Sequence, residues 1–234
     1  MKIANKQTRD GIMQISRVNR PKIAAKKSYD KMSSMYDWLA GSSEEPFMRM
    51  GLEMLDVQPG EEVLEIGCGT GKAQIELCRF AGEQGLICGL DLSPGMLNVA
   101  HNNLAKVGLA DRCHLLCADG MLVPLASHKF SALFLSFTLE LFDTPEIPLV
   151  LAECQRLLKP GGRLVVVAMQ KPRHPSWMVR LYEWFHDKLP NYVDCRPIYA
   201  LDMAKEAGFA IERQQEKNMW GLPVALLLAM KVSR

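Results

Sequence analysis

Short apolar runs alternate with helical patterns along most of the chain. Each run is too short for an independent helix and ends at glycine or polar residues, as a buried strand does. The predicted strands are 63–66, 86–90, 113–117, 132–137 and 164–169. Between several of them, apolar residues recur at helical spacing, over 70–81, 94–107 and 147–158. Strands that alternate with helices predict a parallel, doubly wound α/β sheet.

Further elements are predicted on both sides of this α/β region. Before it, apolar spacing predicts helices over 22–39 and 43–55, each with a proline at or near its start. After it, we expect an amphipathic helix over 177–189, a second helix that ends near Gly208, and two final strands over 209–217 and 224–232. A chain of 234 residues that is 48% hydrophobic can bury one good core. We therefore expect one domain, with a basic arm and helical lid over 1–57, a core over 58–234 and a cap insertion around 171–200.

A glycine-rich stretch, EEVLEIGCGTG at 61–71, joins the first strand to the following helix. Gly67, Gly69 and Gly71 can take the positive φ angles that bring a backbone close to a ligand. The N–H groups at the start of the helix add a partial positive charge. Asp91 stands at the tip of the next strand, where a carboxylate can accept both hydroxyls of a ribose. Together these features predict a site for a nucleoside.

The spacing of the glycines narrows the class of ligand. A dinucleotide fingerprint is G-x-G-x-x-G, and a phosphate-binding loop ends in Gly-Lys-Ser/Thr. This chain has G-x-G-x-G followed by Lys72 and Ala73. Ala73 lacks the hydroxyl that a Mg²⁺ site needs, which argues against a nucleoside triphosphate.

These motifs resemble those of the class I S-adenosylmethionine-dependent methyltransferases, whose first motif is E/D-x-G-x-G-x-G. Residues 65–71 match that motif, and the resemblance continues through 90–96, 118–120 and 157–162. It implies a seven-stranded, mostly parallel, Rossmann-like sheet with an antiparallel C-terminal hairpin. It also implies that the cofactor is S-adenosyl-L-methionine.

In the resembled family, the carboxyl ends of the strands hold the cofactor. Carried over to this chain, Gly67 and Gly69 approach the methionine part, and Asp91 takes the ribose. Leu92 and Met96, after the second strand, flank the adenine ring. Asp119 and Gly120, after the third strand, contact the adenine amino group, and Phe137 and Thr138, after the fourth strand, lie beside the transferred methyl group. The predicted cofactor contacts are Tyr36, Glu65, Gly67, Cys68, Gly69, Thr70, Gly71, Asp91, Leu92, Met96, Asp119, Gly120, Ser136 and Phe137.

Residues 29–37, YDKMSSMYD, resemble the F-D-x-x-A-x-x-Y-D motif of the quinone-ring C-methyltransferases, with Ser33 in place of the alanine. In that family the tyrosine-bearing segment folds over the cofactor, so Tyr36 is the lid candidate. The resemblance implies a small or lipid-like acceptor, with a quinone ring carbon as the leading choice. Phospholipid amine N-methyltransferases share this core and are the second candidate. A non-catalytic module that binds the cofactor or a nucleotide, or a dinucleotide oxidoreductase, also stays open.

The acceptor site is less defined by motifs than the cofactor site. Methyl transfer requires alignment of the nucleophile and exclusion of water, and needs a base only when the nucleophile carries a proton. No catalytic base is assigned. Residues 136–139 lack the Asn/Asp-Pro-Pro-aromatic signature of the resembled amino-methylating enzymes, which argues against a nucleic-acid substrate. The candidate acceptor contacts are Thr138, His174, Tyr192, Arg196 and Trp220.

Charge is concentrated at the N-terminus. The first 27 residues contain eight Lys or Arg residues and one Asp, so this basic arm carries a net charge of +7. It also holds apolar residues, which suits docking on an anionic membrane, although a solvated terminus is the favoured interpretation. No apolar run reaches the roughly 18 residues of a membrane span. We expect a cytoplasmic protein, with peripheral membrane contact through the arm; the sequence does not indicate an oligomeric state.

Seven cysteines are scattered without paired spacing, and no secretory signal precedes them. This favours free thiols in a reducing compartment. Cys113, His114 and Cys117 lie close together, but without a second ligand pair their spacing is poor for zinc. No metal site is therefore expected.

Overall fold

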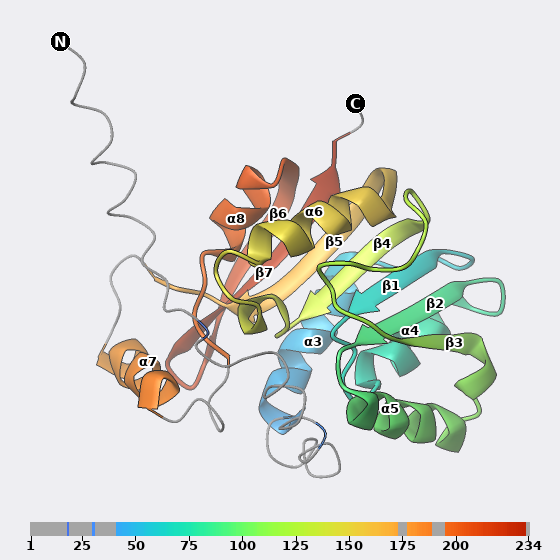
Figure 1. Ribbon diagram of the computed structural model, residues 1–234, viewed down its shortest axis with the longest axis horizontal. Helices are drawn as coiled ribbons and strands as arrows, with labels where there is room; N and C mark the ends of the chain where they lie inside the picture. Colours follow the sequence, from blue (N-terminus) through green and yellow to red (C-terminus); the bar gives the residue numbers. More distant parts are fainter. Residues whose placement is uncertain (1–17, 19–29, 31–40, 173–176, 189–194, 233–234) are drawn as a thin grey trace.

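The computed structural model describes residues 18, 30, 41–172, 177–188 and 195–232. In this part of the chain, seven strands form one sheet in the order β3-β2-β1-β4-β5-β7-β6 (Figure 1). The strands β1 to β5 pair in parallel, and β7 runs antiparallel to both β5 and β6. The bounds are β1 Glu62–Ile66, β2 Leu86–Asp91, β3 Cys113–Cys117, β4 Phe130–Ser136, β5 Leu158–Met169, β6 Phe209–Met219 and β7 Leu222–Lys231. The predicted mostly parallel sheet with an antiparallel C-terminal hairpin is confirmed.

Helices cover both faces of this sheet (Figure 1). One face packs against α3, α4 and α5, and the other against α6 and α8. A further helix, α7, lies at one end of the sheet near the β6–β7 hairpin. The helix bounds are α3 Gly41–Leu55, α4 Lys72–Ala81, α5 Pro94–Lys106, α6 Ile147–Leu157, α7 Trp177–Lys188 and α8 Ala200–Glu206, with short 3₁₀ turns η1 Ala110–Arg112 and η2 Leu139–Leu141.

The chain reverses its winding direction at β1. This strand pairs with β2 on one side and with β4 on the other. In open parallel sheets, ligands bind beyond the carboxyl ends of the strands at such a switch point. The glycine loop at 67–71 follows β1, and Phe137 follows β4. The topology therefore brings both predicted segments to one edge of the sheet.

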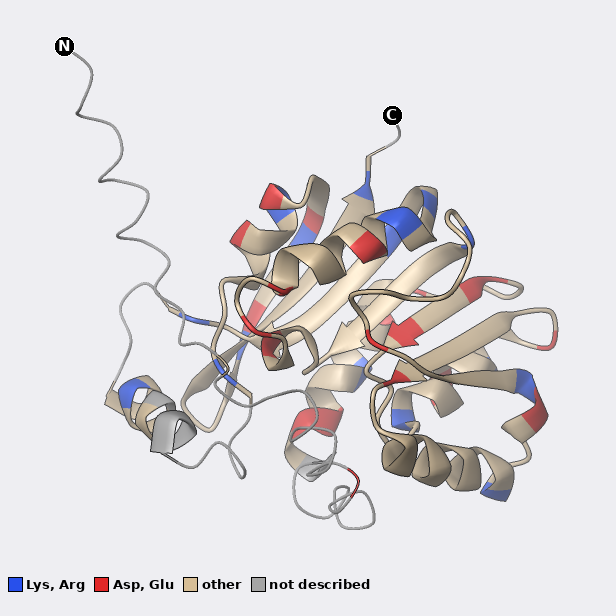
Figure 2. Cartoon of the chain, viewed as in Figure 1, with Lys and Arg blue, Asp and Glu red and all other residues tan. Residues whose placement is uncertain are grey.

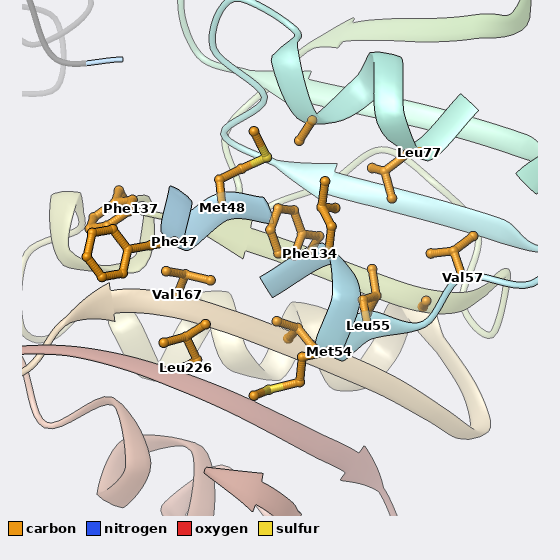
Figure 3. Close-up of a cluster of buried hydrophobic side chains, with 14 of the residues drawn as sticks. Phe47, Met48, Met54, Leu55, Val57, Leu77, Phe134, Phe137, Val167 and Leu226 are labelled. Carbon is orange, nitrogen blue, oxygen red and sulfur yellow. The ribbon is translucent and has the colours of Figure 1, made fainter. Parts of the chain in front are cut away.

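The helix α3 is part of the core and not a lid above it. Its Phe47, Leu52 and Leu55 are buried, and Figure 3 shows side chains of α3 packed against residues of the sheet. A Cβ added at Gly51 would lie 2.5 Å from Cγ2 of Val167, so glycine allows the helix to lie close to the sheet. The predicted lid role therefore does not describe α3. The other predicted lid helix, over 22–39, lies outside the described residues except for one position.

The predicted elements differ most from the structure at the start of β5. This strand begins at Leu158, whereas the sequence predicts a start at 164 because Pro160, Gly161 and Gly162 are typical of a turn. Leu158 pairs with Phe130, and the register then shifts before the next pair. An irregularity of this kind lets a turn-like segment stay within a strand.

Candidate active site

A pocket opens at the carboxyl ends of β1 and β4. Its empty space, with the open mouth included, is about 740 Å³. Ten of the predicted site residues lie along it, together with five that the sequence did not indicate. The lining residues are Glu44, Glu45, Met48, Glu65, Gly67, Cys68, Gly69, Thr70, Lys72, Ala73, Asp91, Met96, Ser136, Phe137 and Thr138.

The glycine loop forms the floor of this pocket. Gly67, Gly69 and Gly71 have φ angles of 77°, 51° and 82°, in the region that favours glycine. A side chain at Gly67 would collide with Thr138, so this glycine lets the loop pack against the segment after β4. A Cβ at Gly69 would meet no atom within 4 Å. The space above Gly69 is therefore open to a ligand.

Asp91 faces this loop from the end of β2. Its Oδ2 accepts a hydrogen bond from the N–H of Gly69 at 2.9 Å, and its Oδ1 accepts one from the N–H of Ser93 at 2.8 Å. Burial raises the pKa of Asp91, and these hydrogen bonds act in the opposite direction. An ionised carboxylate offers about four acceptor positions, so two remain for the hydroxyls of a ribose.

Glu65 is the most deeply buried acid of the pocket, with 3% of its surface exposed. Its Oε2 accepts a hydrogen bond from Nε2 of Gln74 at 2.6 Å, and the Gln74 side chain in turn accepts one from the thiol of Cys113 at 2.7 Å. Burial raises the pKa of Glu65 to about 8, opposed by the Gln74 hydrogen bond, and the nearby charge of Asp91 adds to the rise. Glu65 therefore holds a proton at neutral pH in this state.

The N-terminal part of α3 adds acidic groups at the pocket (Figure 2). Glu44 and Glu45 line it, and Glu45 forms ion pairs with Arg49 at 3.0 Å and Lys72 at 3.7 Å. Four carboxyl side chains and one lysine therefore line the pocket. A lining of this charge favours a positively charged ligand.

Asp30 connects the N-terminal region to this site. Its Oδ1 accepts hydrogen bonds from Oγ of Ser93 at 2.6 Å and from the N–H of Gly95 at 3.0 Å. Ser93 also caps α5 by accepting the N–H of Met96. Sequence reasoning missed this contact, although Asp30 belongs to the motif at 29–37 that is similar to the quinone-ring enzymes.

Comparison with known proteins supports what this geometry suggests. Residues 63–162, which run from β1 into β5 and include the glycine loop and Asp91, match the family model of a methyltransferase domain. The chain carries a methyltransferase domain. The match covers the part of the chain that supplies most of the pocket.

The chain is also similar to proteins of known sequence and, in its fold, to solved structures. The chain is 29% identical to a demethylmenaquinone methyltransferase of Desulfitobacterium hafniense over 164 residues, which make up 70% of this chain. The matched region spans 63% of that relative, less than two thirds of its length. Among solved structures, the fold is similar to that of the [4+2]-cyclase SpnF, with a TM-score of 0.73, 19% identity and coverage of 94% of this chain and 100% of that one.

A second solved structure has a similar fold together with a bound cofactor product. It is the 1,6-didemethyltoxoflavin-N1-methyltransferase of Burkholderia thailandensis, determined with S-adenosylhomocysteine and its substrate. The TM-score is 0.67 at 17% identity, with coverage of 94% of this chain and 95% of that one. At these identities the likeness concerns the fold alone.

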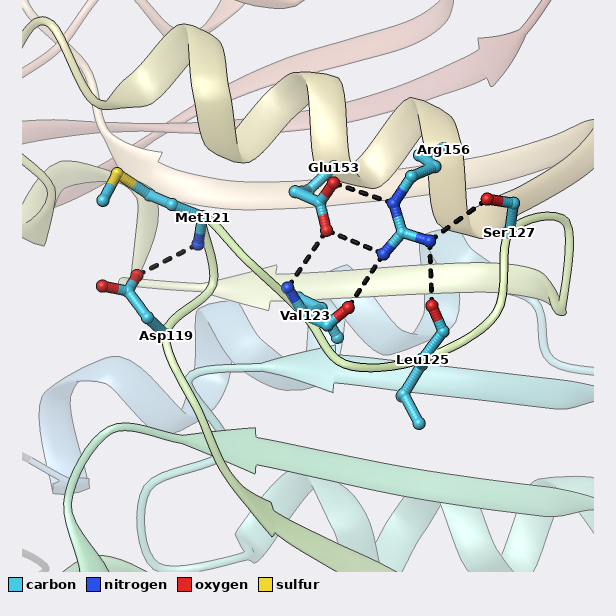
Figure 4. Close-up of polar contacts among 7 residues, drawn as sticks. All are labelled: Asp119, Met121, Val123, Leu125, Ser127, Glu153 and Arg156. Carbon is cyan, nitrogen blue, oxygen red and sulfur yellow. Dashed lines mark hydrogen bonds and ion pairs between the residues drawn. The ribbon is translucent and has the colours of Figure 1, made fainter.

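Several predicted cofactor contacts of the methyltransferase domain lie outside the pocket lining. Gly71 stands at the N-cap of α4, and Leu92 is half-buried beyond the tip of β2. Oδ1 of Asp119 accepts the N–H of Met121 at 3.0 Å (Figure 4). Gly120 is buried, and a Cβ there would lie 3.0 Å from Ile66. Their contacts with a cofactor stay predictions.

The loop after Asp119 is held in place by one ion pair. Arg156 binds Glu153 at 2.8 Å and donates to the carbonyl oxygens of Val123 and Leu125 (Figure 4). Glu153 in turn accepts the N–H of Val123 at 3.1 Å. This pair fixes the connection between β3 and β4 and so the position of Asp119.

Three of the residues predicted to contact the acceptor lie within the described part of the chain, and they do not form one site. Thr138 lines the pocket, and its hydroxyl donates to the carbonyl oxygen of Ser136 at 3.0 Å. Arg196 is fully buried and donates to the carbonyl oxygen of Phe142 at 2.6 Å and to the hydroxyl of Thr144 at 3.2 Å. A guanidinium held in this way supports the surrounding loops, and this arrangement does not offer it to an acceptor.

Trp220 lies at the β6–β7 turn with 77% of its surface exposed, away from the pocket lining. Tyr36, His174 and Tyr192 lie outside the described residues. Within the part of the chain that the structure describes, no three His, Cys, Asp or Glu side chains are grouped to hold a metal ion. In that same part, no helix has the length and apolar character to cross a membrane.

Proposed function

We propose that the protein transfers a methyl group from S-adenosylmethionine to a small or lipid-like acceptor, with a quinone ring carbon as the leading choice. One observation carries the cofactor assignment: the N–H of Gly69 and the carboxylate of Asp91 meet at the edge of an open, acidic pocket. When bound, S-adenosylmethionine supplies a methyl group on a sulfonium cation. The residues of the chain have to bind, orient and shield it.

Each side of the pocket has a distinct part in this proposal. The open space above Gly69 allows a ligand to approach the backbone, and Asp91 retains acceptor positions for a ribose. The carboxylates of Glu44 and Asp91 favour the sulfonium charge of the donor over the uncharged thioether of its product. Met48 and Met96 supply apolar surface on either side.

Phe137 lines the pocket after the end of β4, and in this proposal it lies beside the transferred methyl group. It is buried, although its φ angle of 49° is in the left-handed region that a bulky residue rarely adopts. The N–H of Phe137 donates to the carbonyl oxygen of Val167 at 2.8 Å, and its ring meets that of Phe47 edge to face at 6.4 Å. Strain of about 1–3 kcal/mol that the surroundings maintain is often a feature of functional sites.

Three observations favour a quinone-like acceptor. The motif at 29–37 is similar to that of quinone-ring enzymes, and relatives at 28–30% identity are named demethylmenaquinone or ubiquinone/menaquinone methyltransferases. The apolar side chains Met48, Met96 and Phe137 suit a ring more than a charged acceptor. As part of this proposal, the protein is cytoplasmic and the basic arm over 1–27 brings it to the membrane where such an acceptor dissolves.

The proposal is tested with a panel of acceptors. The full-length protein is incubated with labelled S-adenosylmethionine and, in separate vessels, a demethylated quinol, phosphatidylethanolamine and a total lipid extract. We expect a labelled product, heavier by one methylene group, from the quinol and from the extract. A product from phosphatidylethanolamine alone would replace the quinone by a phospholipid amine. Tight binding of S-adenosylhomocysteine with no product in any vessel would indicate a non-catalytic module.

A further inference from the structure

The helix α7 has apolar side chains on two opposite sides. On the inner side, Val179 is 1% exposed, and the hydroxyl of Tyr182 donates to the carbonyl oxygen of Cys195 at 2.9 Å. On the outer side, Trp177, Leu181 and Trp184 are 71%, 41% and 52% exposed. These three are spaced by four and three residues, so they share one face.

Trp220 extends this apolar surface from α7 to the sheet. It is 77% exposed at the β6–β7 turn and precedes Gly221. A Cβ at Gly221 would lie 3.3 Å from Cγ of Met178, so the turn and α7 are packed together. We call Trp177, Leu181, Trp184 and Trp220 the aromatic surface. Every tryptophan in the described residues belongs to it.

The aromatic surface lies at the same edge of the sheet as the pocket. Val224, near the start of β7, pairs with Met169 at the carboxyl end of β5. The turn before β7 is therefore at the carboxyl edge of the parallel strands, where the glycine loop also lies. Figure 1 shows α7 beside this hairpin at that end of the molecule.

We propose that the aromatic surface docks the protein on a lipid bilayer, at the boundary between headgroups and acyl chains. Exposed apolar patches rimmed by polar residues mark interaction sites. Indole suits this boundary because it joins an apolar ring to one N–H donor, and tryptophan is enriched there. Arg180, exposed on α7 between Trp177 and Trp184, carries the charge that attracts anionic headgroups.

The area of this surface argues against a second copy of the chain. With the exposures given above, and about 250 Å² for each fully exposed indole, the four side chains offer roughly 600 Å² at most. A stable interface buries about 800 Å² on each partner. Insertion into a bilayer has no such threshold, because a few aromatic side chains and charges act together.

Docking at this edge would also affect how the acceptor reaches the pocket. This consequence rests on the function proposed above. An apolar acceptor dissolved in the bilayer would reach the edge of the sheet that carries the pocket without crossing bulk water. The docking itself does not depend on that function, since it involves lipid and the aromatic surface alone.

Vesicle binding tests the docking without any acceptor. The full-length protein is sedimented with vesicles of phosphatidylglycerol and phosphatidylcholine, and tryptophan fluorescence is followed with brominated phosphatidylcholine as quencher. Wild type should bind and be quenched, and the variant W177S/W184S/W220S should partition at least about tenfold more weakly, since each tenfold step corresponds to about 1.4 kcal/mol of lost apolar burial. Arg180→Ala should reduce binding to anionic vesicles only.

Matched controls remove exposed apolar side chains elsewhere. Leu122 and Leu149 are 79% and 54% exposed, on the loop after β3 and on α6, so L122S/L149S should bind vesicles as wild type does. Folding of each variant is checked by its melting temperature and its affinity for S-adenosylhomocysteine. Equal binding by the tryptophan variant, or no vesicle binding by wild type, would overturn the proposal. Self-association of wild type that the tryptophan variant loses would assign the surface to a second copy instead.

Discussion

The N–H of Gly69 and the carboxylate of Asp91 are 2.9 Å apart, although 22 residues separate them along the chain. This hydrogen bond joins the glycine loop after β1 to the tip of β2, so the two predicted halves of a nucleoside site form one unit. Burial raises the pKa of Asp91 while the hydrogen bonds from Gly69 and Ser93 lower it. The carboxylate is therefore positioned before any ligand arrives.

Replacement of Asp91 by alanine should weaken binding of S-adenosylhomocysteine by roughly 2–4 kcal/mol, because two ribose hydroxyls lose a charged acceptor. Calorimetric titration measures the change. Asp111→Ala is the matched control, since Asp111 is an exposed carboxylate in η1 away from the pocket lining. Equal affinities of the two variants would remove Asp91 from the site.

Gly69→Val and Gly108→Val form a second matched pair. Both glycines have positive φ, 51° and 71°, and a Cβ at either would meet no atom within 4 Å. Each variant should therefore suffer similar backbone strain, of about 1–2 kcal/mol. Only the valine at 69 would occupy the pocket, so only that variant should lose S-adenosylhomocysteine binding while it stays folded. Normal binding by folded Gly69→Val would contradict the placement of the loop.

The stability of the ligand-free protein should fall as the pH rises from about 4.5 to about 8. Glu65 has a folded-state pKa of about 8 against a reference of 4.5, so in this window the folded state binds a proton that the unfolded state has released. Stability decreases with pH wherever the folded state binds more protons. The raised pKa of Asp91 acts in the same direction at the acidic end.

Glu65→Gln should flatten this pH dependence, because the amide cannot titrate but can still accept the hydrogen bond from Gln74. Denaturant unfolding at several pH values gives the comparison. If the free energy of unfolding of Glu65→Gln changes with pH as much as that of wild type, other titratable groups cause the pH dependence.

The basic arm is tested by deletion of residues 1–27. Each Lys or Arg near an anionic bilayer contributes about 1 kcal/mol, so the shortened protein should sediment less with anionic vesicles, and added salt should diminish the difference. Its affinity for S-adenosylhomocysteine should stay nearly the same, because the glycine loop and Asp91 are elsewhere. If both forms bind vesicles equally, the arm is a solvated terminus.

The parts of the fold and site that follow from local sequence were predictable. The glycine loop and Asp91 each follow directly after a predicted strand, so each is recognised from a short stretch of sequence, and the topology of a parallel sheet then brings the strand tips together. Glu44 and Glu45 could not be placed in this way. Their position depends on how closely α3 lies on the sheet, which Gly51 allows through a tertiary contact with Val167.

Arg196 is a residue that the sequence assigned to the acceptor site and that the folded chain buries instead. A charged residue in a predicted cap is reasonably assigned to a ligand, but its burial beneath the loop at 142–144 is a property of the folded chain. The start of β5 was missed because a Pro-Gly-Gly segment resembles a turn, whereas Leu158 before that segment pairs with Phe130 and the pairing resumes after it at Arg163.

The most direct measurement follows a labelled methyl group from S-adenosylmethionine to a demethylated quinol in phosphatidylglycerol vesicles, with wild type, Asp91→Ala and Asp111→Ala side by side. The account predicts that wild type and Asp111→Ala methylate the quinol ring at similar rates, and that Asp91→Ala needs far more cofactor for the same rate. Saturable binding of S-adenosylmethionine by wild type with no label on the quinol would contradict the proposed acceptor. No binding of S-adenosylmethionine at all would contradict the account of the pocket itself.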